Sequence, residues 1–558
     1  MTNHRQRVRA LEILVAVAAI LAAAGPVAVL NSCSSCNAPP PEAVTTYHYD
    51  NLRTGWNPNE VNLNYSNVSN GKFQLLHTVG LDDQVDAQPL VVPNVNISAG
   101  SSPGKHDVVY VATEGNTIYA IDASSGATLL SPNFGTPVKM QDLPGQCNNN
   151  GPNVGINGTP VIDLSAKVMY VIVYTQSSSG PAYTLHELDL GTLTDKVPPV
   201  PVGASHTLTN GKTYPFQASY QRQRPGLLLA NGNLYAGFGS FCDNNADLSR
   251  GRVLGWNKGS LTPLPANQLN DILATSPDSF FLSSIWMSGY GLAADDTGNL
   301  YFVTGNSDTP AKGPTTYDPP KNIQESVVKL SADLTKISSI FTPSNVGPLD
   351  QHDTDFGSGG VLLLPEQNPP LPRLATAAGK DGRMFLLNRD NLGGYTPGGP
   401  DNVVGTFNIN GCWCGQSYFF GNNRTVVSSG GNSVILWQIQ TSPKVTLSQV
   451  ASSPPIGGTE DPGFFTSVSS AGATEAIVWA VSRPNNSQNK SGVCQGDNTV
   501  YLYAFNAGGA GGGTLPQLFK AAAGTWPACT ANTNIVPVEA NAKVYVAANQ
   551  QLAIFGLK

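Results

Sequence analysis

The sequence carries few charged residues. Asp, Glu, Lys and Arg make up 12% of its 558 residues, about half of the usual share. The formal net charge is −7, and no block of Lys and Arg follows the first few residues. A protein that binds nucleic acid needs a basic surface for the phosphates. This composition therefore excludes nucleic acid as a partner.

Long helical patterns are also missing after residue 40. Glycine (58 residues) and proline (42) are abundant, and Ser, Thr and Asn crowd the stretches between short apolar runs. Apolar runs of this length, separated by turn residues, are typical of β-strands. A disordered chain would contain fewer Val, Ile, Leu and aromatic residues. The composition predicts a turn-rich, all-β protein.

Two cysteine motifs are absent. No Cys-x-x-Cys pair with zinc-finger spacing occurs in the body of the chain, so a structural zinc site is not expected. No Cys-x-x-Cys-His occurs either, which excludes covalent attachment of a c-type haem.

Residues 1–32 have the pattern of an export signal or membrane anchor. Three arginines within the first nine residues precede an apolar run from Ile13 to Leu30. A basic start followed by an apolar run directs export, so the body of the protein is expected in the periplasm or the outer cell envelope. Residues 33–71 are expected to form a Pro- and Asn-rich linker and lead-in.

Three outcomes stay open for the N-terminal segment. Leu30-Asn31-Ser32-Cys33 resembles a bacterial lipobox, in which Cys33 would carry the lipid, although Asn31 departs from the usual small residue. The apolar run is just long enough to span a bilayer, so a retained anchor is the second outcome. Ordinary cleavage is the third. Membrane contact is expected only through this anchor or lipid.

A repeated unit begins at residues 106–130, HDVVYVATEGNTIYAIDASSGATLL. The unit is predicted to be strand, turn, strand, Asp-x-x-x-Gly turn, strand, since Asp122 can cap the turn and Gly126 can adopt positive φ. Seven further units follow at irregular spacing, and such repeats predict a β-propeller. The last unit lacks a strand, and residues 73–79 (FQLLHTV) lack a unit. We therefore expect residues 72–558 to form an eight-bladed β-propeller of four-stranded blades, closed by this N-terminal strand.

These repeats resemble those of a known family. Val109-Tyr110-Val111-Ala112-Thr113 with Ile118-Tyr119-Ala120-Ile121-Asp122 is similar to the repeat of pyrroloquinoline-quinone (PQQ) propellers. Gly379-Lys380-Asp381-Gly382-Arg383-Met384-Phe385-Leu386-Leu387-Asn388-Arg389 is a closer match. The resemblance covers about residues 72–558 and is specific for the fold, which does not by itself fix an activity.

The predicted loops differ between the two faces of the propeller. If the strands of a blade are named A to D, the D-to-A and B-to-C loops share one face and the other loops share the opposite face. The insertions fall on the first face, and loops on a rigid scaffold commonly carry binding sites. Most residues of chemical interest lie there: Cys147, Arg222, Arg224, Cys242, Asp247, Trp286, Asn306, His352, Asp353, Asp355, Lys380, Cys412, Cys414, Cys494 and Cys529.

Disulfides are expected in an exported protein. A bridge between Cys494 and Cys529 would join blade 7 to the next loop, and one between Cys147 and Cys242 would cross blade 2. For Cys412-Trp413-Cys414 a small closed ring and a reduced pair both stay open, and metal binding by this motif is the less favoured alternative.

The resemblance implies a set of site residues. In PQQ dehydrogenases an acidic residue, an Asn and an Asp hold calcium against the quinone, and an Asp acts as base. The positions that match this pattern are Asp247, Asn306 and Asp355 for the metal, with Asp355 also as the catalytic base, and oxygen ligands suit calcium. Lys380 matches the basic residue that contacts the quinone, and Arg224 and Trp286 are expected to help bind the cofactor.

The sequence also departs from the family. The loop that often carries two adjacent cysteines has Cys147 alone. The position best aligned with the Trp beneath the quinone is Gly291, with Trp286 and Tyr290 only nearby. Singly, each candidate has a plain structural alternative: a turn for Asn306 and Lys380, a core position for Trp286.

We therefore hypothesise a monomeric, exported binding or scaffold module whose elaborated face meets a small ligand or an envelope protein. The alternative is a PQQ- and calcium-dependent dehydrogenase that oxidises alcohols or sugars. In either case His352 and Asp353 are expected to support Asp355, or to be simply solvated, rather than to be ligands themselves.

Overall fold

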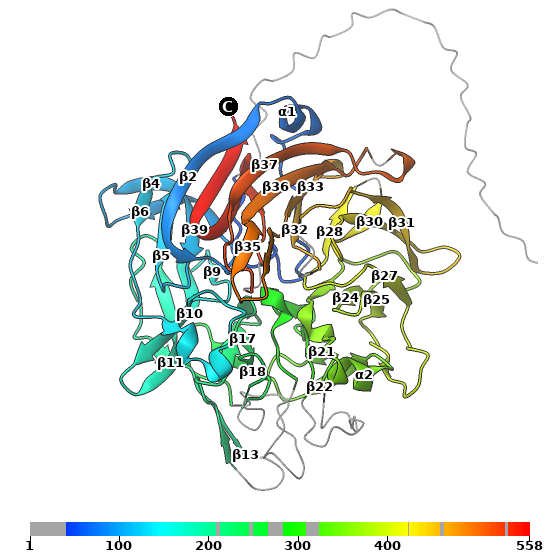
Figure 1. Cartoon of the computed structure of the whole chain (residues 1–558), viewed down its shortest axis with the longest axis horizontal. Helices are drawn as coiled ribbons and strands as arrows, with labels where there is room; N and C mark the ends of the chain where they lie inside the picture. Colours follow the sequence, from blue (N-terminus) through cyan, green and yellow to red (C-terminus); the bar gives the residue numbers. More distant parts are fainter. Residues whose placement is uncertain are drawn as a thin grey trace, which may run out of the picture. The chain divides into compact units, whose positions relative to one another are not determined.

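Eight antiparallel sheets follow one another around a common axis, which confirms the predicted all-β, eight-bladed propeller (Figure 1). The computed structural model describes residues 41–207, 213–244, 249–265, 283–307, 323–421, 423–457, 462–509, 511–530 and 534–558. Across these residues, no helix combines the length and the apolar character that crossing a bilayer requires.

Blades 1 to 4 come from the first half of the chain. Each sheet is antiparallel, and the parallel strand β26 (Gly394–Tyr395), contributed by a later loop, extends blade 4. In blade 3, β15 and β16 both pair with β17 and together make the first strand. Blade 1 consists of β3 (Leu90–Ile97), β4 (Gly104–Ala112), β5 (Ile118–Asp122) and β6 (Thr128–Leu130), and blade 2 of β9 (Val161–Asp163), β10 (Val168–Ser177), β11 (Gly180–Asp189) and β12 (Val200–Pro201). Blade 3 consists of β15 (Gln221–Gln223), β16 (Leu228–Ala230), β17 (Asn233–Ser240) and β18 (Arg252–Asn257), and blade 4 of β19 (Ala293–Ala294), β20 (Leu300–Val303), β21 (Val327–Leu330) and β22 (Ile337–Thr342).

Blades 5 to 8 come from the second half, and the parallel strand β1 (Trp56–Asn57) extends blade 7. Blade 5 consists of β23 (Val361–Leu363), β24 (Leu374–Ala378), β25 (Arg383–Asn388) and β27 (Gly405–Asn408), and blade 6 of β28 (Ser417–Phe420), β29 (Arg424–Ser428), β30 (Ile435–Gln440) and β31 (Thr446–Ser452). Blade 7 consists of β32 (Thr466–Ala471), β33 (Thr474–Val481), β36 (Thr499–Asn506) and β37 (Gln517–Thr525), and blade 8 of β38 (Val538–Ala540), β39 (Lys543–Leu557) and β2 (Phe73–Gln84).

The N-terminal strand closes the ring. β2 runs antiparallel to β39, from Phe73 opposite Leu557 to Gln84 opposite Asn549, and the two lie side by side in Figure 1. β39 is itself a hairpin that reverses at Gln550, whose φ is +57°. A Cβ on Gly556 would lie 3.3 Å from the carbonyl oxygen of Ala542, so the two ends of β39 are adjacent. Blade 8 thus has four strands, and the predicted closure is confirmed.

The insertions build small elements in the D-to-A and B-to-C loops. They comprise three two-stranded ribbons, the helix α2 (Val346–Gln351) and four 3₁₀ turns: β7 (Val138–Lys139) with β8 (Asn153–Val154), β13 (Ser205–Thr207) with β14 (Thr213–Pro215), β34 (Asn485–Gln488) with β35 (Cys494–Asp497), η1 (Met140–Asp142), η2 (Pro144–Gln146), η3 (Met287–Gly289) and η4 (Phe356–Ser358). A short helix, α1 (Tyr65–Ser69), precedes β2, and η5 (Gly511–Gly513) precedes β37. Turns such as Asp122 to Gly126 remain tight on the other side, where Asp122 accepts the Ser124 and Ser125 N–H groups.

Residues 44–57, which we call the axial segment, hydrogen-bond to the first strand of every blade. The bonded pairs, in chain order, are Val44 with Val91 (blade 1), Thr45 with Ile162 (blade 2), Asn51 with Leu229 and Ala294 (blades 3 and 4), Leu52 with Leu363 (blade 5), Thr54 with Tyr418 (blade 6), Gly55 with Val468 (blade 7), and Tyr49 and Asn57 with Glu539 (blade 8). Eight strands that touch one short segment must surround it. The segment therefore lies on the propeller axis.

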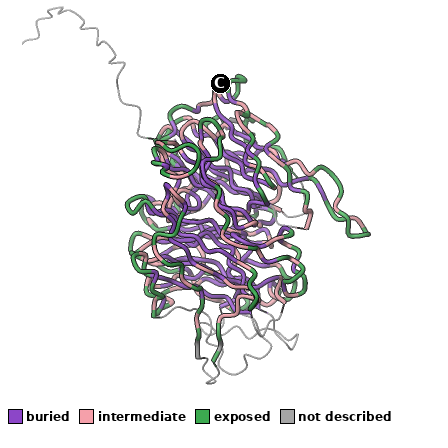
Figure 2. Tube along the Cα trace, turned by 90° about the vertical axis from the view of Figure 1, so that its left-hand side faces the viewer, coloured by how far each residue is buried: buried purple, intermediate pink, exposed green. Residues whose placement is uncertain are grey.

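The burial pattern agrees with this arrangement. Figure 2 shows buried residues throughout the interior and exposed residues mainly at the loops. Arg53, at the middle of the axial segment, is fully buried. Its guanidinium donates to the carbonyl oxygens of Leu292, Tyr47 and Leu227 at 2.7, 2.8 and 3.3 Å, and to Thr46 Oγ1 at 2.7 Å. The axis is thus filled by polar backbone whose hydrogen bonds are satisfied, as burial requires.

Candidate functional site

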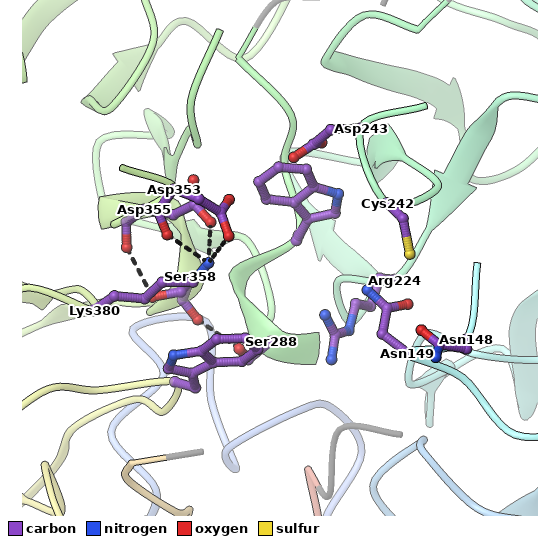
Figure 3. Close-up of a pocket in the computed structure, with 12 residues that line it drawn as sticks. Asn148, Asn149, Arg224, Cys242, Asp243, Ser288, Asp353, Asp355, Ser358 and Lys380 are labelled. Carbon is purple, nitrogen blue, oxygen red and sulfur yellow. Dashed lines mark hydrogen bonds and ion pairs between the residues drawn. The ribbon is translucent and has the colours of Figure 1, made fainter. Parts of the chain in front are cut away.

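An ion pair lies on the elaborated face, in the loops of blades 4 and 5. Asp355 precedes η4 in the loop that enters blade 5, and Lys380 occupies the turn between β24 and β25. Lys380 Nζ is 2.6 Å from Asp355 Oδ2 and 3.3 Å from Asp353 Oδ2, and it donates to the Asp353 carbonyl oxygen at 3.0 Å. Figure 3 shows the two carboxylates gathered around this ammonium group. Asp353 therefore contacts Lys380 through its carbonyl oxygen and its mostly exposed carboxylate.

Burial and charge act in opposite directions on this pair. Burial raises the pKa of the Asp355 carboxyl, Lys380 lowers it, and the net shift is upward. Burial lowers the pKa of Lys380, while Asp355 and Asp353 raise it, and the net shift is again upward. A carboxyl group of raised pKa beside a fixed cation has the properties of a proton acceptor in a binding site.

A cavity of about 320 Å³ opens beside the ion pair. Four of the predicted site residues line this cavity, namely Asp355, Lys380, Arg224 and Trp286. Figure 3 shows Arg224 and Asn149 across the cavity from Lys380. The remaining lining residues are Asn148, Cys242, Asp243, Ser288, Asp353, Ser358 and Trp413. Two indoles, two cations and three carboxylates thus face one small space.

Glycines hold Trp286 in the cavity wall. Its indole N–H donates to the Ser240 carbonyl oxygen at 3.1 Å. A Cβ on Gly305 would lie 2.3 Å from Trp286 Cζ3, and one on Gly239 would lie 2.6 Å from Nε1. Only glycine fits at these two positions, because any side chain would displace the ring.

Asn306 lies against Asp355 through its backbone. Its backbone N–H donates to the Asp355 carboxylate. Four buried side-chain oxygens near this contact have no hydrogen-bond partner among the described residues: Asn306 Oδ1, Gln324 Oε1, Glu325 Oε1 and Asp355 Oδ1. Such oxygens are costly to leave unpaired, and they are the donor type that calcium takes. The donor set fits a hard cation.

Asp247, the third predicted metal ligand, lies outside the described residues. Among those described, no group of three or more His, Cys, Asp and Glu side chains is arranged to hold a metal. A cation beside Asp355 would therefore rest on this carboxylate, the Asn306 amide and the Glu325 carboxyl, which lies close enough to feel the Asp355 charge.

The sequence interpretation missed two acidic residues here. Burial raises the pKa of Asp243 to about 7, with a smaller contribution from the charge of Asp355. Burial and the Asp355 charge also hold the pKa of Glu325 well above its ordinary value, although its Oε2 accepts the Phe356 N–H at 2.6 Å. Asp243 adjoins a predicted disulfide cysteine, which was an available signal. Glu325 follows a long insertion, and nothing local marks it.

Gly291 has a structural explanation. A Cβ there would lie 2.8 Å from Arg53 Nε, so the axial segment excludes any side chain at the position best aligned with the family's stacking Trp. Tyr290 is core: its hydroxyl donates to the Arg53 and Gln416 carbonyl oxygens at 2.8 and 2.9 Å, and Tyr47 and His48 contact its ring.

Three disulfides stabilise the loops of this face. Cys494 pairs with Cys529 and Cys147 with Cys242, as predicted, with Cα–Cα separations of 5.6 and 5.5 Å. Cys412 and Cys414 form the small closed ring, with a Cα–Cα separation of 5.0 Å. The Cys147–Cys242 bridge reaches the cavity through Cys242.

Comparison with known proteins establishes the fold. No protein-family model matches the sequence, and no curated protein matches it. Among solved structures, the quinohemoprotein alcohol dehydrogenase from Comamonas testosteroni is similar over 92% of this chain and 80% of its own, with 13% identity and a TM-score of 0.58. A europium-containing methanol dehydrogenase is similar over 93% of this chain and 99% of its own, with 11% identity and a TM-score of 0.57. The chain has the fold of these dehydrogenases. At these identities the likeness extends to the fold alone.

Proposed function

We propose that this protein is an exported, monomeric PQQ-type propeller that binds a small, flat, polar ligand in the cavity beside Asp355. The observation that carries the proposal is the buried Asp355–Lys380 ion pair, held in a cavity of about 320 Å³ that two indoles also line. A small apolar-and-polar cavity with convergent charged groups of perturbed pKa is the usual form of a ligand site.

The lining determines which ligands fit. Indole faces favour flat rings, and the Lys380 and Arg224 cations favour ring substituents that accept hydrogen bonds. The carboxylates of Asp353 and Asp355 already offset the charge of Lys380, so a highly charged anion gains less here than a carbonyl or a carboxylate spread over a conjugated ring. Quinones with carboxyl groups meet these requirements.

The second candidate is a PQQ- and calcium-dependent dehydrogenase. The specific observation in its favour is the set of unpartnered oxygens on Asn306, Gln324, Glu325 and Asp355. Asp355 and Asn306 would hold the calcium, Lys380 and Arg224 would contact the quinone, and the bound quinone would supply the oxidising chemistry. Asp355 would also accept the hydroxyl proton of an alcohol or sugar, since burial raises its pKa.

One experiment separates the two functions. The protein is reconstituted with PQQ and CaCl₂, freed of excess quinone, and examined for quinone absorbance and for dye reduction with alcohols and sugars. Bound quinone without dye reduction supports a binding module, and both signals together support the dehydrogenase. Absence of bound quinone at micromolar concentration overturns the enzyme and makes PQQ the wrong ligand for the cavity.

Export remains part of the proposal. Its support is the basic and apolar pattern of residues 1–32 together with three disulfides, which persist in oxidising compartments. Export is tested by treating cells with a protease that does not cross membranes, with and without permeabilisation of the outer membrane. Cleavage only in lysed cells would contradict it.

A further inference from the structure

Two buried acidic side chains meet on the face opposite the cavity. Glu539 lies in β38, the first strand of blade 8, and Glu60 lies in residues 58–63, which we call the connector. The connector joins the axial segment to α1 and β2. Glu539 is fully buried and Glu60 is 3% exposed. Ion pairs among the described residues include neither of them.

Glu60 joins the connector to the turn of blade 8. Its Oε1 accepts the N–H groups of Asn62 and Leu63, within the connector, at 2.6 and 2.9 Å. Its Oε2 accepts the N–H of Ala542, in the turn between β38 and β39, at 2.8 Å. Both oxygens of Glu60 are therefore hydrogen-bond acceptors.

Glu539 completes the contact from the other side. Its Oε2 accepts from Asn57 Nδ2 at 2.8 Å. Among the described residues, its Oε1 accepts from no N–H or hydroxyl group, and the remaining partner of this carboxyl is Glu60. Two carboxyl groups can hydrogen-bond to each other only when one of them carries a proton. Since Glu60 already accepts three N–H groups, the proton belongs on Glu539.

The surroundings favour a neutral Glu539. Burial and the charge of Glu60 raise the pKa of Glu539 well above its ordinary value, and Glu42 raises it further. Glu42 is tied to the connector through Asn59, whose Nδ2 donates to Glu42 Oε2 at 2.8 Å. The other titratable groups nearby are tyrosines. The Tyr49 hydroxyl donates to the Glu539 carbonyl oxygen at 2.9 Å, and Tyr545 on β39 feels the Glu539 charge. Each of these groups is neutral or negative, so none would offset a charge on Glu539.

We propose that Glu60 and Glu539 form a proton-operated latch, which holds the connector on blade 8 and opens as the pH rises. Loss of the shared proton to solvent leaves two carboxylates facing each other in a buried space, where like charges repel strongly. Asn57 and Leu63, on either side of Glu60, are both buried, so opening displaces the connector while the axial segment and β2 stay in place. The latch is independent of the proposed ligand site and acts on a different face.

Hydrogen–deuterium exchange of the full chain measures the opening directly. The amides of Asn62, Leu63 and Ala542 report it, because the Glu60 carboxyl is their acceptor. Their protection factors, which correct for the intrinsic pH dependence of exchange, should fall at least about tenfold between pH 5 and pH 9, since loss of one proton changes an equilibrium up to tenfold per pH unit. The amides of Ala236 and Leu254, paired within blade 3, are the control and should keep their protection.

Two single variants identify the group that carries the proton. Glu539→Gln keeps a donor for Glu60 and an acceptor for Asn57, as the protonated acid does. Its protection factors should match the wild type at pH 5 and change less than about twofold up to pH 9. Glu60→Gln replaces an accepting oxygen with an amide nitrogen, which cannot accept an N–H, and should lower protection at both pH values. Circular dichroism confirms that each variant is folded.

Three results would overturn the latch. The first is a wild type whose connector amides keep the same protection from pH 5 to pH 9, as the Glu539→Gln variant is expected to do. The second is a parallel fall in blade 3, which would mean that the whole propeller opens. The third is a Glu60→Gln variant with the protection of the wild type at pH 5. Reconstitution with PQQ tests the proposed function separately.

Discussion

Replacement of Arg53 is expected to destabilise the propeller more than any surface change. The three shortest bonds of its guanidinium go to Leu292 O, Thr46 Oγ1 and Tyr47 O. Arg53→Met removes them and leaves two buried carbonyl oxygens without these donors. At about 1.5 kcal/mol for each bond to a charged group, the loss of unfolding free energy is about 4 to 5 kcal/mol. Asp50, which is half-buried, raises the pKa of this guanidinium through its charge, and Arg53→Met would remove that favourable interaction as well.

Equilibrium unfolding in urea, followed by circular dichroism, measures this loss. Arg53→Lys is the matched control, since it keeps the charge but loses the planar fork, and we expect a smaller loss of about 1 to 2 kcal/mol. Hydrogen exchange should show faster exchange at the amides that bond to the axial segment, such as Leu363 and Tyr418. A Met variant within about 1 kcal/mol of the wild type, or equal to the Lys variant, would refute the view that the axial segment holds the blades together.

Three further predictions concern single side chains. Gly305→Ala should lower the free energy of unfolding by about 1 to 3 kcal/mol and shift the tryptophan fluorescence, since the new Cβ would clash with Trp286. The control Gly347→Ala has open space around its Cβ and should be neutral or slightly stabilising. Equal effects of the two variants would contradict this geometry. Lys380→Met should weaken binding of PQQ at least about tenfold and destabilise the fold by about 3 kcal/mol, because the buried Asp355 carboxylate loses its cation; unchanged calorimetric affinity would exclude Lys380 from the site. Burial lowers the pKa of His48 in the folded protein to about 3. As the pH falls below about 6.5, the imidazole takes up a proton in the unfolded chain but not in the folded protein, so the free energy of unfolding decreases. Between pH 7 and pH 5, the free energy of unfolding of His48→Phe should therefore fall by about 2 kcal/mol less than that of the wild type, as measured by urea titration. Parallel pH profiles of the two proteins would show that His48 does not change its protonation on unfolding.

The propeller was predictable because its signals are local. Alternating apolar residues define the strands, and turns such as Asp122 to Gly126 define where they reverse. The closing strand β2 could be found by counting, since the last unit lacked one strand and residues 73–79 had no unit. A bridge between Cys494 and Cys529 was plausible from their places in blade 7 and the next loop, although the sequence left the disulfide pairing open.

The axial segment was not predictable in the same way. Residues 44–57 have neither strand alternation nor helical spacing, and their conformation is set by hydrogen bonds to eight strands that are distant in sequence. The same limit applied to the site. Asp355 and Lys380 were found through the resemblance, and the structure places them 2.6 Å apart, but the roles of Asp243 and Glu325 depend on burial, which no short motif reports.

The closure of the ring by β2 dictates an order of folding. Residues 73–84 find their partner only when residues 549–557 exist, so the strand synthesised first must wait, unpaired at one edge, for the strand synthesised last. The axial segment waits as well, because its eight partners are spread over the whole chain. Contacts this distant make folding slow. The ring therefore cannot close until the last residues of the chain have been synthesised.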